Sequence, residues 1–517
     1  MYESNMISLE DYIVDSQSNV EKEEINNEVL TEKHEEKKVE EIVSGEVIPL
    51  TSQDEGNTID LNKYSYQYRT DKENKNIAKK NISPEILTDI SEFLSNKHKK
   101  LFQESIIDKK KRQNLSVIIS DFISSNSITV PGYSADELIK SVIDSLSGLG
   151  VLEDLIDNEN ITDIMVNGRS EIYVEELGVG EYKTNLRFPS DAALNAVAMK
   201  IVNASGESLT TSKPYVDCKY PTMRINIVTG EICGQGIAIS IRKFGKKVRI
   251  TDQSMIETNQ GNEDMVKTLE AFVKAGLNML IVGPTGSGKT ELLKYLVKHI
   301  EDNERFIMLE DTAETRLKDI YPDKHIVSME CRFTGSEESD VDYPVLLKNA
   351  LRQNPARIGV GECRGDEAVH MIEIYNTGHE GGMTTGHSNS AADGVKRLVQ
   401  MCLRSGMKLD PDVIGEWVTS TFDIVIFQKK MKDQHRRIRE IIELRGYEDN
   451  KPIYTTLYKM KIDGHEQVEG RKQILCSHHQ KGFLSIDVAT KLYEAGIDIE
   501  TYKHLVSDED KEELGIV

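Results

Sequence analysis

The stretch LNMLIVGPTGSGKTELLKYLVKHI, residues 277–300, decides the fold class of this chain. Its central octet, GPTGSGKT at 283–290, matches the pattern G-x-x-x-x-G-K-[S/T] without deviation. An apolar segment precedes the octet and a helix-forming segment follows it, which predicts a strand, a loop and a helix. Glycines let successive N–H groups of such a loop face one concavity, and the helix N-terminus adds partial positive charge there. We therefore expect a phosphate-binding loop in an α/β domain rather than a plain glycine-rich turn.

The whole octet, called the phosphate loop below, is predicted to bind a nucleotide. Lys289 can reach the β- and γ-phosphates of ATP, and the Thr290 hydroxyl can ligate Mg²⁺. The predicted cofactor is Mg²⁺ with ATP. The predicted nucleotide-binding residues are Gly283, Pro284, Thr285, Gly286, Ser287, Gly288, Lys289 and Thr290.

Carboxylates at neighbouring strand ends complete the expected site. Glu310 and Asp311 follow the apolar RFIML, with Glu314 one turn later, and Glu362 follows RIGV. One carboxylate can hold the metal or its water shell while another polarises the attacking water. Glu310 and Glu362 are predicted as catalytic residues and, with Thr290, as metal ligands. The alternative is that these glutamates are helix caps or solvated turn residues.

Strand-like and helix-like segments alternate beyond residue 263, which favours a mostly parallel sheet with covering helices. Upstream, apolar residues recur first at helical spacing and then in alternating, strand-like runs. The predicted divisions are a disordered acidic tail at 1–80, a helical subdomain at 81–155, an α+β domain at 156–245, a linker at 246–262 and the nucleotide-binding domain at 263–517, with an extension from about 450.

Composition limits the partners of the chain. Its 517 residues carry a formal net charge of −23, which disfavours direct contact with nucleic acid. The six cysteines form no C-x-x-C pair, so we expect free thiols in the cytoplasm and no zinc ribbon. Neither a signal peptide nor an apolar run long enough to span a bilayer is recognisable, so any membrane contact is predicted to be peripheral.

Taken with the phosphate loop, three further motifs resemble those of a known family. EDTAE at 310–314 is similar to its acidic box, RIGVGECRGDEA at 357–368 to its Walker B segment, and NTGHEGGMTTGHSNS at 376–390 to its histidine box. ITDIMVNG and AISIRKF, upstream, resemble signatures of its N-terminal domain. The family is that of the ATPases of type II and type IV secretion and pilus assembly, and within it the CpaF/TadA-type motors of tight-adherence (Flp) pili.

The resemblance implies roles for one histidine and three arginines. His387 is expected to contact or sense the γ-phosphate, whereas His379 and His387, eight residues apart with no third ligand nearby, do not have the spacing of a metal site. Arg224, Arg242 and Arg332 are candidates to stabilise charge on the γ-phosphate from an adjacent domain or subunit. Surface ion pairs are the alternative role for each arginine.

The implied protein is a RecA-like ATPase with an α+β N-terminal domain, hexameric and peripheral at the inner face of the cell membrane. It would couple hydrolysis of ATP to pilin assembly or export through an inner-membrane platform. A DNA-transfer or competence motor is the nearest alternative, followed by a nucleotide-gated scaffold and a small-molecule kinase. Gly359 and Cys363 depart from the family pattern, where apolar residues are usual, and are expected to weaken strand packing.

Overall fold

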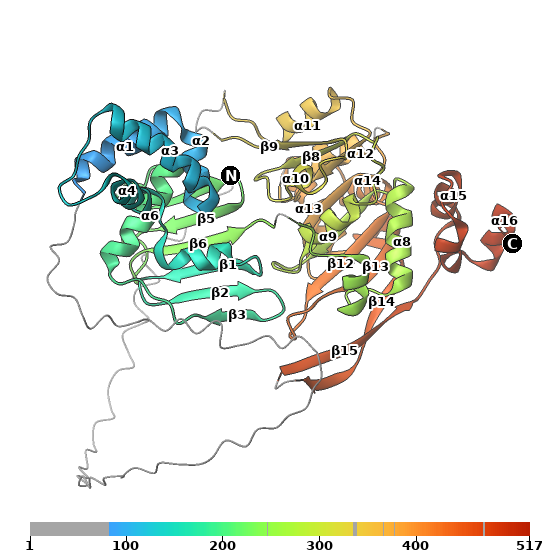
Figure 1. Cartoon of the computed structure of the whole chain (residues 1–517). Coiled ribbons are helices and arrows are strands. Elements are labelled where there is room, and N and C mark those ends of the chain that lie inside the picture. Colours follow the sequence, from blue (N-terminus) through green and yellow to red (C-terminus); the bar gives the residue numbers. More distant parts are fainter. Residues whose placement is uncertain are drawn as a thin grey trace, which may run out of the picture. The chain divides into compact units, whose positions relative to one another are not determined.

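The computed structural model describes residues 82–245, 247–333, 339–365, 367–376, 378–468 and 471–516. The predicted acidic tail, residues 1–80, lies outside these ranges. Residues 77–517 form one compact unit, to which all the elements below belong (Figure 1).

The N-terminal part of this unit begins with helices. They are α1 (Pro84–Lys97), α2 (Lys99–Ile107), α3 (Lys109–Ser125), α4 (Ala135–Ser147), the 3-10 turn η2 (Gly150–Leu152) and α5 (Glu153–Asp157). Local sequence explains why α4 forms. Ser134 and Glu137 form a reciprocal capping box at the start of α4, and Gly148 follows its last turn. The buried residues of α4 recur at helical spacing and face the core.

A six-stranded antiparallel sheet follows, in the order β3-β2-β1-β6-β5-β4. Its elements are β1 (Ile161–Asn167), β2 (Ile172–Glu176), β3 (Gly180–Lys183), α6 (Asp191–Ser205), β4 (Tyr215–Tyr220), β5 (Met223–Val228) and β6 (Ala238–Lys243). β1 and β2 form the hairpin predicted about Gly168, whose φ of 70° only glycine adopts readily.

Alternation along these strands gives the sheet two unlike faces. In β5, for example, Met223, Ile225 and Ile227 are buried in one core with α6 and the N-terminal helices. The intervening residues, Arg224 and Asn226, belong to the opposite, polar face. That face also carries charged side chains of β1, β2, β4 and β6.

The second sheet has nine strands in the order β15-β14-β13-β12-β7-β11-β10-β8-β9. The six strands from β12 to β9 are parallel, and β13, β14 and β15 extend the sheet as an antiparallel ribbon. Its strands are β7 (Met279–Gly283), β8 (Phe306–Glu310), β9 (Ile326–Glu330), β10 (Arg357–Val360), β11 (Met383–His387), β12 (Ile424–Lys430), β13 (Arg436–Glu448), β14 (Lys451–Val468) and β15 (Arg471–Gln480).

Helices cover both faces of this sheet (Figure 1). They are α7 (Asp252–Glu257), α8 (Glu263–Lys274), α9 (Lys289–Val297), α10 (Leu317–Ile320), α11 (Tyr343–Leu351), α12 (Glu367–Tyr375), α13 (Ala391–Arg404), α14 (Pro411–Thr421), α15 (Ile486–Glu494), the 3-10 turns η3 (Ile499–Thr501) and η4 (Lys503–Leu505), and α16 (Asp508–Leu514). Met279 and Ile281 of β7 enter one core and Leu280 and Val282 the other, so this strand is buried on both sides. The predicted α/β fold with a mostly parallel sheet is confirmed.

The predicted linker contains more structure than its sequence suggested, and the strand-like and helical segments past residue 450 join the second sheet and its core. The polar segment 246–262, predicted as a linker, includes α7, and its Met255 is fully buried in the core of the second sheet. Past residue 450, β14 pairs with β13, and Val488, Ala489 and Leu492 of α15 join the same core.

Gly359 was expected to weaken strand packing, and the structure shows why it does not. β10 lies between β8 and β11 with Phe306 of β8 packed over the glycine. A Cβ at this position would come within 2.5 Å of Phe306 Cζ. Gly359 is therefore the residue that makes room for the phenylalanine, and Cys363, also expected to weaken the strand, is buried in the core.

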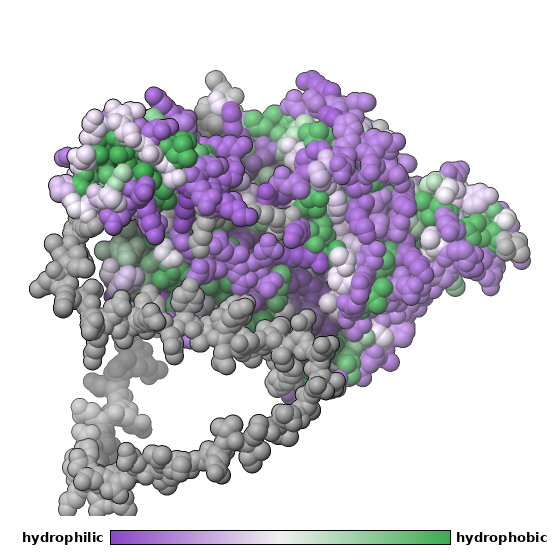
Figure 2. All heavy atoms as spheres, in the orientation of Figure 1, coloured by the Kyte–Doolittle hydropathy of each residue, from purple (hydrophilic) through white to green (hydrophobic). Residues whose placement is uncertain are grey.

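The surface is mainly hydrophilic on the face that Figure 2 shows, where hydrophobic residues lie in small separate groups. Among the described helices, none is both long and apolar enough to cross a membrane.

Candidate functional site

The phosphate loop joins β7 to α9, the strand, loop and helix that the sequence predicts. Gly286 and Gly288 have φ values of 72° and 88°, in the left-handed region that favours glycine. At Gly283 a Cβ would lie 2.0 Å from the Gln428 carbonyl oxygen. Backbone conformation and close packing thus require these three glycines, and α9 begins at Lys289, the seventh residue of the octet.

Lys289 is buried beside the loop. Its Nζ donates to the carbonyl oxygens of Gly283 and Pro284, each at 3.2 Å, and lies 3.4 Å from His387 Nδ1. Burial lowers the pKa of Lys289 to about 8, and the nearby Glu362 carboxylate opposes this shift. The lysine ammonium is therefore poorly solvated, which increases its attraction for a bound phosphate.

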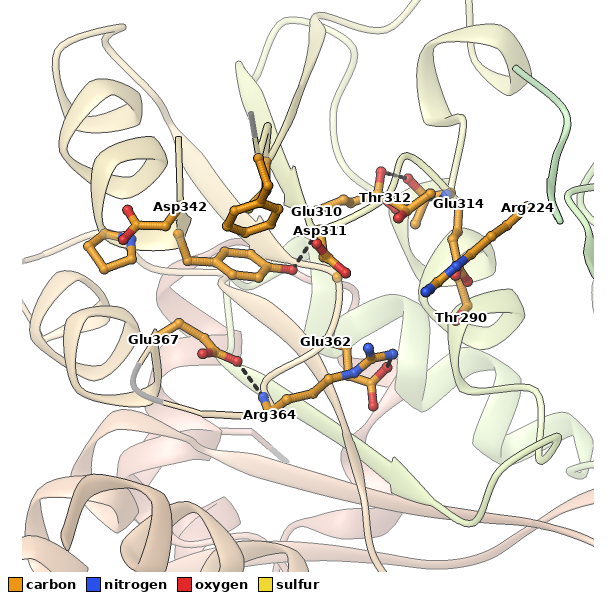
Figure 3. Close-up of a pocket in the computed structure, with 16 residues that line it drawn as sticks. Arg224, Thr290, Glu310, Asp311, Thr312, Glu314, Asp342, Glu362, Arg364 and Glu367 are labelled. Atoms are coloured by element: carbon orange, nitrogen blue, oxygen red, sulfur yellow. Dashed lines mark hydrogen bonds and ion pairs between the residues drawn. The ribbon is translucent and has the colours of Figure 1, made fainter. Parts of the chain in front are cut away.

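A pocket of about 420 Å³ opens next to the loop (Figure 3). Thr290 of α9, the acidic box after β8, Glu362 after β10 and Arg224 of the N-terminal sheet all line it. Because β7, β8 and β10 are parallel, their carboxyl ends meet at one edge of the sheet, where ligands of α/β proteins bind. Its size suits a small-molecule ligand such as a nucleotide phosphate chain.

Glu310 is held by its own loop. The side chain is 3% exposed, its Oε1 accepts from the Thr315 N–H at 2.9 Å, and its Oε2 accepts from the Thr315 hydroxyl at 2.6 Å. Burial raises the pKa of Glu310 to about 7 despite these two bonds. Each oxygen accepts one hydrogen bond within its own loop, which indicates a structural role, and Glu310 also lines the pocket, so its catalytic and metal-binding roles stay predictions.

Glu314 is the acidic-box carboxylate that faces charged partners. Burial raises its pKa, while the guanidinium groups of Arg242, Arg364 and Arg224 act in the opposite direction. Figure 3 shows Glu314 and Arg224 side by side near Thr290. Glu314 thus lines one pocket with Thr290, Arg224 and Arg364, where a phosphate held by the loop would lie.

Glu362 and His387, each indicated by its own motif, lie in contact. His387 Nε2 lies 2.8 Å from Glu362 Oε1, and Arg364 Nη2 lies 2.5 Å from Glu362 Oε2. Burial and the neighbouring Lys289 lower the pKa of His387, so the imidazole is neutral at pH 7. A polar chain therefore runs from Arg364 through Glu362 and His387 to Lys289.

Two of the three predicted arginines lie on the polar face of the N-terminal sheet. Arg224 lines the pocket and pairs with Asp217 at 3.5 Å. Arg242 pairs with Asp163 at 3.0 Å, and its charge opposes the rise that burial causes in the pKa of Glu314. Lys219 of the same face donates to the Asp311 carbonyl oxygen at 3.1 Å, which brings this sheet against the acidic box.

Arg332 and His379 are two remaining candidates from the sequence. Arg332 donates to the Ser339 carbonyl oxygen at 3.4 Å, and its neighbours Cys331 and Phe333 line the pocket. His379 precedes β11, whereas His387 is the last residue of that strand and lies beside Glu362 and Lys289. That the two histidines form no metal site stays a prediction.

Three residues outside the predicted set also shape the site. Arg364 pairs with Glu362, and Gln428 Nε2 donates to the Ser287 carbonyl oxygen at 2.6 Å. Arg436 Nε donates to the Gly286 carbonyl oxygen at 3.1 Å. Gln428 has a sequence signal, a polar residue that ends the apolar run IVIFQ, whereas Arg436 begins β13 in a charged stretch with no distinguishing pattern.

The donor set fits a magnesium nucleotide better than a metal held by protein alone. Within the described ranges, no three His, Cys, Asp or Glu side chains are gathered as ligands for a metal ion. The Thr290 hydroxyl and the Glu362 carboxylate both border the pocket beside the loop. A cation held there would need phosphate oxygens to complete its coordination.

Comparisons with known proteins agree with these motifs. The model of one protein family, described as type II/IV secretion system protein, matches residues 145–482. An uncharacterized protein of Bacillus anthracis is 30% identical over 352 residues, which cover 68% of this chain and 77% of that protein. Conjugal transfer protein TrbB of Rhizobium radiobacter is 29% identical over 300 residues, which cover 57% of this chain and 87% of TrbB. Among solved structures, the VirB11 ATPase from the Brucella suis type IV secretion system has a TM-score of 0.32 at 24% identity, over 59% of this chain and 96% of that one.

Proposed function

Because the chain belongs to the family of type II/IV secretion system proteins, we propose that it is an ATP-hydrolysing motor of a pilus-assembly or secretion system. The observation that carries the proposal is the pocket that combines Thr290 of the phosphate loop, two acidic segments and Arg224 of the N-terminal sheet. The reaction is the hydrolysis of ATP to ADP and phosphate. Its energy would drive domain motions that assemble or export pilin through an inner-membrane platform.

The phosphate loop and Lys289 bind the phosphates in this proposal. Loop N–H groups and the start of α9 face the phosphate chain, and Lys289 exchanges its two carbonyl partners for phosphate oxygens. Thr290 and Glu362 would hold the Mg²⁺ that accompanies ATP, directly or through water. When bound, Mg²⁺ neutralises charge on the phosphate oxygens.

Glu314 is the proposed general base. It accepts a proton from the attacking water, the water oxygen bonds to the γ-phosphorus, and the bond from that phosphorus to the bridging oxygen of ADP breaks. Arg224 and Arg364 line the same pocket as this carboxylate, and with Arg242 they would stabilise the charge that spreads over the γ-oxygens. His387 would position Glu362 and detect the γ-phosphate. Arg332 remains a candidate only if its loop or another subunit brings it to the phosphate.

The proposed motion of the two sheets follows from where the arginines and the phosphate loop lie. Arg224 and Arg242 belong to the N-terminal sheet, and the phosphate loop belongs to the second sheet. Bound ATP would attract both, and loss of phosphate would remove part of that attraction. In the proposed assembly six copies form a ring at the cytoplasmic face of the inner membrane, bound to a platform protein without crossing the bilayer.

The assignment within the family rests on sequence motifs. The acidic box, the Gly-Glu ending of RIGVGE and the histidine box together favour a CpaF/TadA-type motor of tight-adherence pili. A DNA-transfer motor is the second candidate, because one relative is a conjugal transfer protein. The net charge of −23 argues against direct contact with DNA, although a motor of this kind need not touch the DNA itself.

The experiment that tests the proposed activity is Mg²⁺-dependent ATP turnover by the purified chain over a range of protein concentrations. We expect specific activity to rise with concentration as a ring forms, and Lys289→Ala to be inactive at every concentration. Activity equal to that of Lys289→Ala would refute the ATPase assignment. Full activity in a protein that stays monomeric would refute the ring.

Cellular assays separate the two candidate roles. A deletion of the gene complemented by wild-type or Glu314→Gln protein would be scored for surface pili and for plasmid transfer. Loss of pili alone supports the proposal, and loss of plasmid transfer with normal pili supports the DNA-transfer motor.

A further inference from the structure

Three residues distant in the sequence meet behind the phosphate loop: Glu175 of β2, Arg436 at the start of β13, and Gly286. Arg436 Nε donates to the Gly286 carbonyl oxygen at 3.1 Å. Its Nη2 lies 3.6 Å from Glu175 Oε1. A single guanidinium thus joins the N-terminal sheet to the loop.

The surroundings restrict this guanidinium. The Arg436 and Glu175 side chains are 25% and 23% exposed, so neither is freely solvated. A Cβ at Gly288 would come within 2.7 Å of Arg436 Cδ, so the arginine stem lies against the loop. A planar guanidinium holds its donors in a fixed relation, and a shift of Glu175 is therefore passed to the Gly286 carbonyl.

The next carbonyl of the loop is held from the same strand pair. Gln428 of β12 donates to the Ser287 carbonyl oxygen, and its own side-chain oxygen accepts from Gln260 at 3.1 Å. Turning carbonyl groups away from the phosphates leaves N–H groups to face them. Gln428 thus contacts Gln260, whereas Arg436 contacts Glu175 of the N-terminal sheet.

Lys430 provides an internal control. Its Nζ lies 2.7 Å from the same Glu175 oxygen, which makes a second ion pair between the two sheets. Within the described part of the chain, the hydrogen bond of Lys430 goes to Glu175 and not to the phosphate loop. The effect of an ion pair between the sheets can therefore be separated from the effect of a contact with the loop.

We propose that Arg436 is a positioning residue through which Glu175 couples the place of the N-terminal sheet to the shape of the phosphate loop, and so to nucleotide affinity. The inference rests on the proposed function, since it requires a nucleotide at the loop. Coupling of this kind is reciprocal, so a bound nucleotide also biases the N-terminal sheet toward the position in which Glu175 meets Arg436. Neither residue touches the reacting atoms.

The test is the dissociation constant of Mg-ADP, measured by titration calorimetry on the full chain. Arg436→Lys keeps the positive charge but cannot reach both partners at once, so we expect binding to weaken about tenfold, the loss of one charge-assisted hydrogen bond. Glu175→Gln should weaken it by about threefold to tenfold through the same arginine. The dissociation constant of the double variant should lie within about twofold of that of Arg436→Lys, because Glu175 acts on the loop through Arg436. Lys430→Gln should stay within about twofold of wild type.

Three results would overturn the inference. Wild-type affinity in Arg436→Lys would mean that charge alone matters, and multiplied losses in the double variant would mean that the two residues act independently. Equal losses in Lys430→Gln and Glu175→Gln would assign the effect to ion pairing between the sheets in general. Thermal unfolding without nucleotide verifies that each variant is folded. If wild type binds no better than Lys289→Ala, the proposed function itself fails, a result distinct from the other three.

Discussion

Replacing Glu310 with glutamine separates its proposed structural role from catalysis. Glu310 is buried, and the Thr315 N–H and hydroxyl occupy its two oxygens. Glutamine resembles the neutral carboxylic acid: its oxygen can accept from the N–H, and its amide can donate to the hydroxyl. The substitution therefore removes the ionisable group and keeps the contacts.

The magnitude follows from the pKa of the buried carboxyl. Burial raises it from 4.5 to about 7, and each unit is worth about 1.36 kcal/mol. Above pH 7 the folded protein holds a buried carboxylate at a cost of about 3 kcal/mol, whereas below pH 4.5 the group is neutral in both the folded and unfolded states. The contribution of Glu310 to stability thus falls as pH rises from 4.5 to 7. Glu310→Gln should be about 3 kcal/mol more stable than wild type at pH 8 and nearly equal to it at pH 4.5.

The assay is urea unfolding of both proteins at several pH values, followed by the fluorescence of Trp417, the single tryptophan, in α14. ATP turnover is measured on the same samples and should stay within about threefold of wild type, because the contacts of the loop are kept. A stability difference that does not change with pH would refute the burial argument. A hundredfold loss of turnover would return Glu310 to the catalytic set.

Three further predictions concern packing and the phosphate loop. In urea unfolding, Gly359→Ala should lower the free energy of unfolding by about 1–3 kcal/mol, because the new methyl group meets Phe306. The same change made in a Phe306→Leu protein should cost less, and an equal cost in the two proteins would contradict the packing argument. Burial lowers the pKa of Lys289 to about 8, so the affinity for Mg-ATP should decline as pH rises from 8 to 9.5; this decline should be absent in Lys289→Ala, and a flat wild-type profile would contradict the role of the lysine. His387→Gln should reduce turnover about tenfold with little effect on the melting temperature, because it breaks the chain from Glu362 to Lys289; unchanged turnover would remove His387 from the site.

The sequence was sufficient for features that local chemistry dictates. GPTGSGKT between an apolar strand and a helix predicted the phosphate loop, and carboxylates at successive strand ends predicted the site edge, because parallel strands end together. The hairpin at Gly168 followed in the same way. These predictions concern residues whose environment is set within a few positions of the chain.

The sequence was insufficient where distant segments meet. Nothing in EDTAE distinguishes Glu310, which turns back to Thr315, from Glu314, which faces the arginines, since the difference arises from the loop after β8. Arg436 lies 150 positions from Gly286, and no local pattern marks their contact. The sequence around Gly359 predicts a weak point in the strand, because its packing partner Phe306 lies on another strand.

One comparison on Glu314→Gln decides whether ATP binds at the phosphate loop and is hydrolysed there with Glu314 as base. Mg-ATP binding and phosphate release would be measured on the same preparation, with wild type and Lys289→Ala beside it. We expect binding within about threefold of wild type and phosphate release reduced by about 10²-fold or more, the effect of losing a general base. Phosphate release at the wild-type rate from Glu314→Gln would refute the role of Glu314 as base.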